Sequence, residues 1–235
     1  MTKYKRVLLK LSGEAFLGNR EYGIDPEFTT WLAKEIIKAK NNTEIAIVVG
    51  GGNIFRGTAA EENGLERTVG DYIGMLATIM NSLALQAALE KEGQPTRVLS
   101  AIDIKDVCEP YIRRRAVRHL EKGRVVIFAG GSGNPYFTTD TAAALRALET
   151  ECDIIMKATK VDGVYDKDPN KNPNAKKFDT IDFKQAITNK DIEIMDNSAL
   201  SMCMDHNIPI LVFNLTKQDN IKKAVSGEKL GTLIS

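Results

Sequence analysis

Three glycine-rich segments contain the residues of this chain that are best suited to bind phosphate. They are KLSGE at 10–14, GGGNIFRG at 50–57 and GGSGNPYFTTD at 130–140, and each follows a short apolar run. Glycine lets backbone amides approach an anion closely, and helix N-termini add positive potential there. Lys10 and Arg56 bring charge to the first two segments, and a guanidinium can hold phosphate at two positions. The pattern indicates a protein that binds phosphorylated molecules.

A fourth segment follows the third along the chain. Lys157 comes after the apolar run 153–156, and KVDGVYDKDP at 160–169 offers a turn, the aromatic ring of Tyr165 and the acid Asp168. An aromatic ring and an acid suit a purine and its ribose. Each segment also has a simpler interpretation, because a lone lysine usually reaches solvent and a glycine run can be only a tight turn. The order of all four segments favours the functional interpretation.

The elements that must position these segments alternate between strand and helix. Apolar runs predict strands, and amphipathic stretches predict helices. The strands are expected at 7–11, 45–49, 97–102, 125–129, 153–156 and 210–213, and the helices at 26–40, 71–92, 113–121, 140–149, 198–206 and 220–225. Such alternation predicts an α/β fold with a mostly parallel central sheet sandwiched by helices. Ligands of such sheets bind at the carboxyl ends of the strands, where the glycine segments would meet.

One compact domain is expected over residues 1–235, with no linker or internal repeat. The polar stretch 162–177 contains two prolines and a glycine, so it predicts a surface loop, with a lid as one use for it. The helix at 71–92 is apolar nearly all round and needs cover on more than one side. Either it is central to the core or one face is a subunit interface. Asp71 is either the N-cap of that helix or a ligand-binding acid.

Composition and missing motifs exclude several function classes. With 32 basic and 31 acidic side chains, the chain lacks the basic excess of nucleic-acid binders. There is no GxxxxGK[ST] loop, and Phe55 and Tyr136 stand where the last glycine of a dinucleotide fingerprint would be. A P-loop enzyme and a dehydrogenase are therefore disfavoured.

The cysteines and histidines also lack the spacing of metal or nucleophilic sites. Cys108, Cys152 and Cys203 are widely separated and predict reduced thiols, and His119 and His206 are isolated. No protein-held metal is expected. The first residues are polar, and the apolar run after them is too short for a signal peptide or a membrane span, so a cytoplasmic location is expected.

In order, KLSGE, GGGNIFRG, DYIGMLAT at 71–78, GGSGNPYFTTD and KATKVDGVYDKDP at 157–169 resemble the amino acid kinase family. Within it, the order is most similar to the bacterial uridylate (UMP) kinases, and the similarity runs from about Tyr4 to the terminal LGTLIS. The resemblance implies a three-layer αβα fold that binds the acceptor with about residues 1–150 and ATP with about 151–235. It also implies transfer of the ATP γ-phosphate to UMP.

The resemblance assigns roles residue by residue. Lys10, Asp140, Lys157 and Arg56 would carry the chemistry. ATP would be bound by Lys10, Leu11, Ser12, Gly13, Gly52, Arg56, Thr159, Tyr165 and Asp168. UMP would be bound by Gly51, Asp71, Ser132, Gly133, Asn134, Pro135, Tyr136, Phe137, Thr138 and Thr139.

The resemblance further implies Mg²⁺ bound with ATP, a cytoplasmic homohexamer, activation by GTP and inhibition by UTP. Arg97 and Arg124 match basic positions of the effector site, whereas Glu21-Tyr22-Gly23 and Gln86-Ala87 depart from the family pattern. Two alternatives remain open. One is a related kinase acting on an acyl or carbamoyl phosphate substrate, and the other is a non-catalytic nucleotide or oxyanion sensor or storage protein.

Overall fold

The computed structural model describes residues 3–55, 64–169, 171–189, 192 and 194–235. Arg56, a predicted phosphate ligand, lies outside these residues. The described strands are β1 (Arg6–Leu11), β2 (Glu44–Val49), β3 (Thr96–Ser100), β4 (Glu109–Pro110), β5 (Val125–Ala129), β6 (Ile154–Thr159), β7 (Thr180–Ile181), β8 (Ile210–Asn214) and β9 (Thr232–Ile234). The helices are η1 (Gly13–Leu17, a 3-10 helix), α1 (Pro26–Lys40), α3 (Arg67–Lys91), α4 (Arg113–Glu121), α5 (Thr139–Glu149), α6 (Phe183–Thr188), α7 (Asn197–Asp205) and α8 (Asn220–Ser226).

These strands form one sheet in the order β4-β3-β5-β2-β1-β6-β8-β9-β7. The neighbours pair in parallel, except β8 and β9, which are antiparallel. Strand β2 pairs with β1 on one side, and β6, which comes later in the chain, pairs with β1 on the other side. Ligands of open α/β sheets bind where the strand order reverses in this way. The predicted parallel α/β architecture is confirmed.

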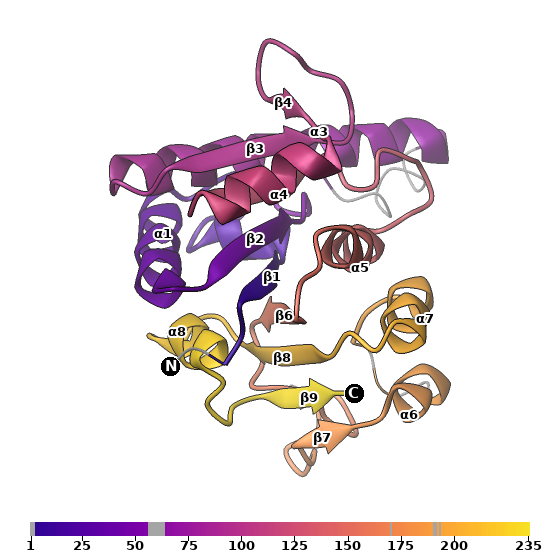
Figure 1. Ribbon diagram of the computed structural model, residues 1–235. Coiled ribbons are helices and arrows are strands. Elements are labelled where there is room, and N and C mark those ends of the chain that lie inside the picture. The colour runs from indigo at the N-terminus through magenta and orange to yellow at the C-terminus, as the bar shows by residue number, and fades with distance from the viewer. Residues whose placement is uncertain (1–2, 56–63, 170, 190–191, 193) are drawn as a thin grey trace.

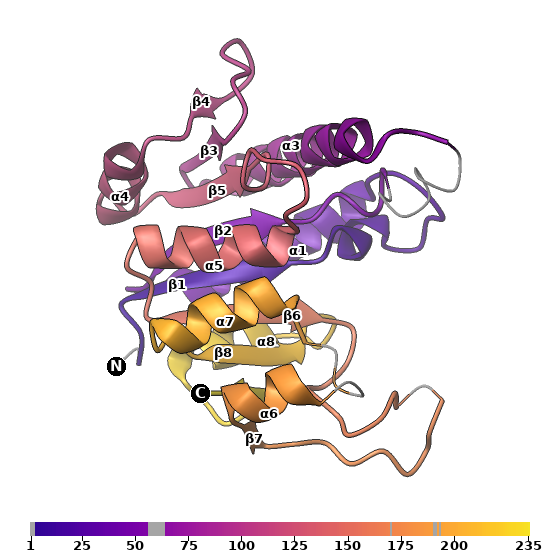
Figure 2. The same ribbon diagram turned by 90° about the vertical axis from the view of Figure 1, so that its right-hand side faces the viewer.

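Helices cover both faces of the sheet, as Figures 1 and 2 show. One face packs on α1, α3 and α8 through a core that includes Leu32, Ile36 and Leu85. The other packs on α4, α5, α6 and α7, with Leu120, Ala143 and Leu200 in its core. Strands buried on both faces need apolar side chains at nearly every position, which explains the continuous apolar runs. The three-layer prediction is therefore correct.

Local sequence signals account for the best-predicted helix. Asp25 caps α1 by accepting hydrogen bonds from the amides of Glu27 and Phe28, at 2.9 and 3.3 Å. Proline occupies the first helical position, where its missing N–H costs nothing. The helix spans Pro26–Lys40, as predicted.

The start of α3 was predicted four residues too late. Asp71 is not the N-cap but lies in the second turn, and the helix begins at Arg67 after the cap residue Glu66. The Asp71 carboxylate instead accepts hydrogen bonds from Arg67 Nε, at 3.1 and 3.0 Å. Aspartate often caps helices, but Asp71 lies inside the helix and binds Arg67 instead. The sequence alone does not reveal this contact.

Among the described helices, α3 is the one that is long and apolar enough to cross a membrane by length and composition. Helices in the core of globular domains can have the same length and apolar composition. In this fold α3 packs against α1, β3 and β5, and Leu85 and Leu89 are fully buried there. Its composition therefore fits a core helix that also has an outer face.

Other boundaries differ for tertiary reasons. The sixth strand continues to Thr159, because β1 and β8 pair with it on both sides, so Lys157 lies inside the strand rather than after it. The short elements β4, β7, β9 and α6 were not predicted. Stretches of two to six residues carry little periodicity, and they form here because neighbouring elements pair with or cover them. The described residues of the stretch 162–177 form a loop, as expected, with one bridge between Tyr165 and Lys177.

Candidate active site at the carboxyl edge of the sheet

Two lysines and one aspartate form the centre of the candidate site. Lys10 on β1 and Lys157 on β6 are direct register partners on adjacent parallel strands, so their side chains leave the same face of the sheet. Lys10 Nζ lies 2.6 Å from one oxygen of Asp140, and Lys157 Nζ lies 2.8 Å from the other. The Asp140 carboxylate bridges two ammonium groups that are 147 positions apart in the chain.

The environment keeps Asp140 ionised. Burial alone would raise the pKa of this carboxyl, but the charges and hydrogen bonds of Lys10 and Lys157 outweigh it, and the pKa lies below its ordinary value. Lys157 also donates to the Ile194 carbonyl. Both ammonium groups are therefore held at fixed positions, only slightly exposed to solvent.

Helix α5 places Asp140 in its first turn. Thr138 is the N-cap, and its hydroxyl accepts hydrogen bonds from the amides of Asp140 and Thr141, at 3.0 and 3.2 Å. Thr138 in turn donates to Asp196, the N-cap of α7, which also accepts from Thr141 Oγ1 at 3.0 Å. The first turns of two helices are thereby joined beside the lysines. With Thr138 as its cap, α5 begins at Thr139, one residue before the start expected at residue 140.

The first two glycine turns lie against each other. The Gly50 amide donates to the Leu11 carbonyl at 2.9 Å. A Cβ atom on Gly13 would stand 2.6 Å from the Gly52 amide nitrogen and 2.7 Å from the Gly50 oxygen, so no side chain fits there. The close approach of the two backbones therefore requires glycine at position 13. The backbone amides of both turns are thus gathered at the end of β1 and β2.

The third glycine turn is attached to α3. The Gly130 amide donates to Thr78 Oγ1 at 2.9 Å, and the Tyr136 amide donates to Asp71 Oδ2 at 2.7 Å. Tyr136 has a φ of 71°, a conformation that an L-residue adopts only when its surroundings fix it. Tyr136 and Phe137 remain 68% and 53% exposed. Two aromatic rings held in solvent beside a glycine loop are available for a planar ligand.

A cavity of about 890 Å³ opens beside the lysines on the side of α5 and α7. Asp140, Lys157 and Thr159 form the end nearest the centre, and Tyr165 and Asp168 lie on the loop that follows β6. Its remaining walls include Val164, Ile192, Ile194 and Met195. The cavity thus combines apolar walls with a cationic end, which suits a ligand that has a flat ring and phosphates.

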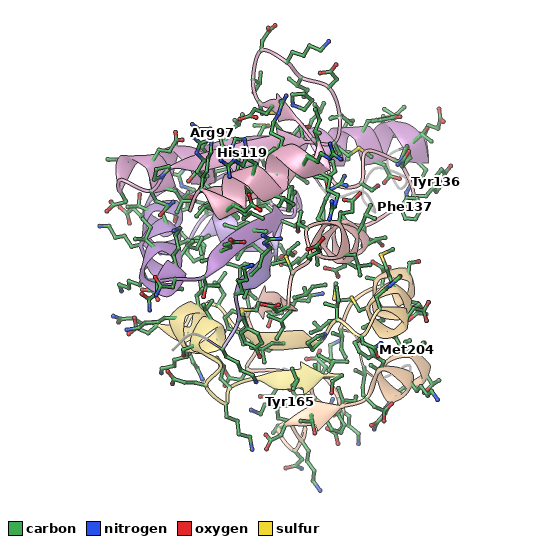
Figure 3. The ribbon with its side chains drawn as sticks, viewed as in Figure 1. Arg97, His119, Tyr136, Phe137, Tyr165 and Met204 are labelled. Carbon is green, nitrogen blue, oxygen red and sulfur yellow. The ribbon has the colours of Figure 1, made fainter. Side chains whose placement is uncertain are left out.

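The other predicted residues fall in different places. The Leu11 side chain is fully buried in the core, so only its backbone is available to a ligand. Arg97 pairs with Glu90 and Glu109, at 3.3 and 3.7 Å, and Arg124 lies 2.8 Å from His119 Nδ1. Figure 3 shows Arg97 and His119 far from Tyr136 and Phe137. The partners named here for the two arginines lie on α3, β4 and α4, whereas Lys10, Lys157 and Asp140 lie on β1, β6 and α5.

Several residues that support the site do not stand out in the sequence as site residues. Asp196, Thr78 and the reciprocal amide pair of Asn53 and Asn81 are buried or hydrogen-bonded against the loops just described. Polar residues inside an apolar helix were a signal, because Thr78, Asn81 and Ser82 interrupt the apolar pattern of α3. What they contact could not be read from one sequence.

Comparison with known proteins identifies the family of this arrangement. The sequence matches the amino acid kinase family over residues 5–214. The chain belongs to this family. The resemblance expected from the sequence is thus confirmed.

Solved structures of family members are similar over almost the whole chain. UMP kinase from Bacillus anthracis is 41% identical, with a TM-score of 0.95, over 99% of this chain and 96% of that chain. UMP kinase from Ureaplasma parvum is 40% identical, with a TM-score of 0.93, over 99% of each. Uridylate kinase from Archaeoglobus fulgidus is 31% identical, with a TM-score of 0.75, over 97% and 99%.

Proposed function

We propose that this amino acid kinase transfers the γ-phosphate of ATP to UMP and forms UDP and ADP. The observation that carries the proposal is the pair of lysines held on one carboxylate at the carboxyl edge of the sheet. The similar structures from Bacillus anthracis and Ureaplasma parvum are described as UMP kinases, which supports the choice of acceptor.

The chemistry needs charge stabilisation more than acid–base catalysis. A phosphate oxygen of UMP forms a bond to the γ-phosphorus of ATP while the bond to the bridging oxygen breaks, and ADP leaves with that electron pair. The attacking oxygen is already ionised at neutral pH, so no histidine base is required. Catalysis then depends on alignment and on cations beside the transferring group. Lys10 and Lys157 supply such cations, and Asp140 orients them. Arg56 would add a guanidinium.

The two substrates would lie on either side of the lysines. The cavity of about 890 Å³ with Thr159, Tyr165 and Asp168 would take the adenosine of ATP, and Ser12, Gly13 and Gly52 would bind its phosphates. UMP would lie at Gly51, Asp71 and the loop 132–139. This places the acceptor mainly on about residues 1–150 and ATP mainly on about 151–235.

Mg²⁺ would enter as part of Mg-ATP. Among the described residues, no three His, Cys, Asp or Glu side chains gather as a metal site. Mg²⁺ prefers to keep water and phosphate ligands, so ATP oxygens can hold it without a protein cage. Mg²⁺ therefore belongs to the substrate in this proposal.

Assembly and regulation form a further part of the proposal. The outer face of α3 exposes Val69, Tyr72, Leu76 and Met80, each 43% to 52% accessible, which is a large apolar surface for one helix. We expect a second copy to cover it within a homohexamer. GTP would activate through the region of Arg97 and Arg124, and UTP would inhibit. The enzyme would work in the cytoplasm, in pyrimidine nucleotide synthesis.

One assay tests the main proposal. UDP formation is measured with UMP and Mg-ATP, with and without GTP, and CMP, carbamate and acetylglutamate are tested as competing acceptors. Rapid transfer from Mg-ATP to UMP, with no comparable transfer to the other acceptors, supports the proposal. Turnover of carbamate or acetylglutamate instead would favour a related kinase. Binding of UMP and ATP without turnover would favour the nucleotide-binding sensor or storage protein.

A further inference from the structure

The inner face of α3 contacts both glycine loops of the acceptor side. Asp71, Gly74, Thr78 and Asn81 follow one another at intervals of three, four and three residues, so they share one face of the helix. Each meets a different part of the loops. Asp71 accepts from the Tyr136 amide, Gly74 lies against Gly51, Thr78 accepts from the Gly130 amide, and Asn81 donates to the Gly50 carbonyl.

Thr78 is the buried support of the third glycine turn. Its side chain is 3% exposed, and the hydroxyl donates to the Met75 carbonyl at 2.7 Å while accepting from the Gly130 amide at 2.9 Å. Gly130 has a φ of 75°, so the chain turns sharply at this bond. A buried amide that loses its acceptor carries its full desolvation cost, and the turn would rearrange to avoid it.

Asn81 is the buried support of the second glycine turn. Asn53 and Asn81 exchange two side-chain hydrogen bonds, at 2.9 and 2.7 Å, and both are at most 3% exposed. Asn81 also donates to the Gly50 carbonyl at 2.7 Å, and Asn53 donates to the Gly23 carbonyl at 2.9 Å. Gly51 packs directly on the helix, because a Cβ atom there would stand 2.9 Å from the Gly74 oxygen.

We propose that Thr78 and the Asn53–Asn81 pair are positioning residues for phosphoryl transfer. This inference rests on the proposed UMP kinase function. Thr78 sets the loop 130–137, which faces the acceptor. The amide pair sets the turn 50–53, which carries Gly51 on the acceptor side and Gly52 on the donor side. Because one rigid helix holds both supports, the two loops keep a fixed spacing along α3.

Thr78→Val tests the first half, because valine keeps the shape of threonine and removes the hydroxyl. Loss of one buried hydrogen bond of this kind corresponds to about a tenfold effect. We expect the KM for UMP to rise about tenfold, while the KM for ATP changes less than about twofold. Thr78→Ser restores the hydroxyl and should return the KM for UMP to near the wild-type value. A Thr78→Val enzyme with an unchanged KM for UMP would overturn the assignment, as would an equal rise in both constants.

Ser82→Ala is the matched control on the next turn of α3. Ser82 is fully buried, and its hydroxyl donates to the Thr78 carbonyl within the helix at 2.7 Å. Its removal should lower the Tm and leave both KM values unchanged. If Ser82→Ala raised the KM for UMP as much as Thr78→Val does, general loosening of the helix would explain both results, and the positioning role would be wrong.

The Asn53–Asn81 pair predicts a different kinetic pattern. Asn53→Ala and Asn81→Ala should each raise the KM for both UMP and ATP, and the double variant should be no worse than the poorer single variant, because the two amides act as one unit. Effects that multiply in the double variant would contradict this. Asn53→Ala lies in the turn rather than in the helix, so it keeps the test open if Asn81→Ala does not fold.

Hydrogen exchange of the Gly130 amide separates this inference from the proposed function. In the absence of nucleotide, exchange at Gly130 should be faster in Thr78→Val than in the wild-type protein, and Thr78→Ser should restore it. Equal exchange in all three would overturn the inference even if the wild-type enzyme forms UDP. A wild-type protein that forms no UDP would overturn the proposed function and leave the exchange result to judge the positioning of the loop.

Discussion

Lys10 and Lys157 occupy paired positions on the neighbouring parallel strands β1 and β6, and their ammonium groups lie on opposite oxygens of Asp140. The pairing arises from the topology of the sheet, because β1 and β6 are neighbours although four other strands separate them in the chain. Two cations held by a single anion leave a net positive charge at the edge where the glycine turns meet. This excess charge is what a transferring phosphate would neutralise.

Removal of either ammonium group should strongly reduce turnover. Lys10→Met and Lys157→Met keep the alkyl chain, and each should lower kcat about 10²- to 10³-fold, the effect of deleting one electrostatic donor. Steady-state kinetics with UMP and Mg-ATP measure this. Lys34→Met, which removes an exposed lysine 3.6 Å from Glu92, should retain wild-type kcat. Near-normal turnover of either site variant would show that its lysine is not catalytic.

The Asp140 carboxylate predicts a loss of stability in acid. Its pKa in the folded protein lies below its ordinary value, because Lys10 and Lys157 favour the ionised form, so the unfolded chain binds the proton more readily. The ion pairs of Asp140 therefore contribute fully to the free energy of unfolding at pH values above the ordinary carboxyl range. This contribution is lost as the pH falls through the lowered pKa of Asp140. Asp140→Asn should abolish that part of the pH dependence and destabilise the protein at neutral pH by about 3 kcal/mol, because two buried cations lose their partner.

Urea unfolding of wild type and Asp140→Asn between pH 3 and pH 7 measures this effect. Asp205→Asn, which changes an exposed carboxylate at the end of α7, is the control and should keep the wild-type slope. Parallel stability curves for wild type and Asp140→Asn would contradict the expectation.

Local signals and topology differ in how well a sequence reveals them. The boundaries of α1 were predictable because Asp25 and Pro26 act within one helical turn of it. The parallel sheet followed from continuous apolar runs, since a strand buried on both faces leaves no polar alternation. The gathering of the glycine turns at the carboxyl edge was predictable, because each turn follows an apolar run that forms a strand of the parallel sheet. The amino acid kinase family followed from the order of these segments.

The remaining features depend on contacts between distant residues. Asp71 carries the same residue type whether it caps a helix or accepts the Tyr136 amide across 65 positions, so the sequence did not distinguish these uses. The supports Thr78, Asn81 and Asp196 are polar residues whose partners lie on other elements. Strand β9 has three residues and exists because it pairs with β8 and β7. Such features become visible only when the strand order is known.

Asp71 should determine the preference for ribose over deoxyribose. It already accepts hydrogen bonds from Tyr136 N and Arg67 Nε, and a carboxylate has lone pairs left for a ribose hydroxyl. A nucleotide without that hydroxyl, such as dUMP, cannot donate this hydrogen bond to Asp71, so UMP should be preferred over dUMP. In Asp71→Asn the ratio of kcat/KM for UMP to that for dUMP should fall at least about tenfold.

Competition assays with UMP and dUMP check this ratio. Glu66→Gln, which removes a carboxylate at the N-cap of the same helix, is the matched control and should keep the wild-type preference. If Asp71→Asn discriminates between the two nucleotides as well as wild type does, the ribose contact is made elsewhere.

The outer face of α3 should hold the oligomer together. Leu76 and Met80 are 47% and 52% exposed in the single chain, and the opposite face of their helix supports the glycine loops through Thr78 and Asn81. A charge placed at Leu76 or Met80 would be buried without a partner in an assembly, so Leu76→Glu and Met80→Glu should reduce the mass measured by light scattering at micromolar concentration. Tyr22→Glu, at a residue that is 68% exposed outside this helix, should leave the mass unchanged.

Two other outcomes would be informative about this face of α3. A wild-type protein that is already monomeric under these conditions would show that the apolar face serves another purpose. Dissociation accompanied by a higher KM for UMP would link assembly to the loops that α3 supports.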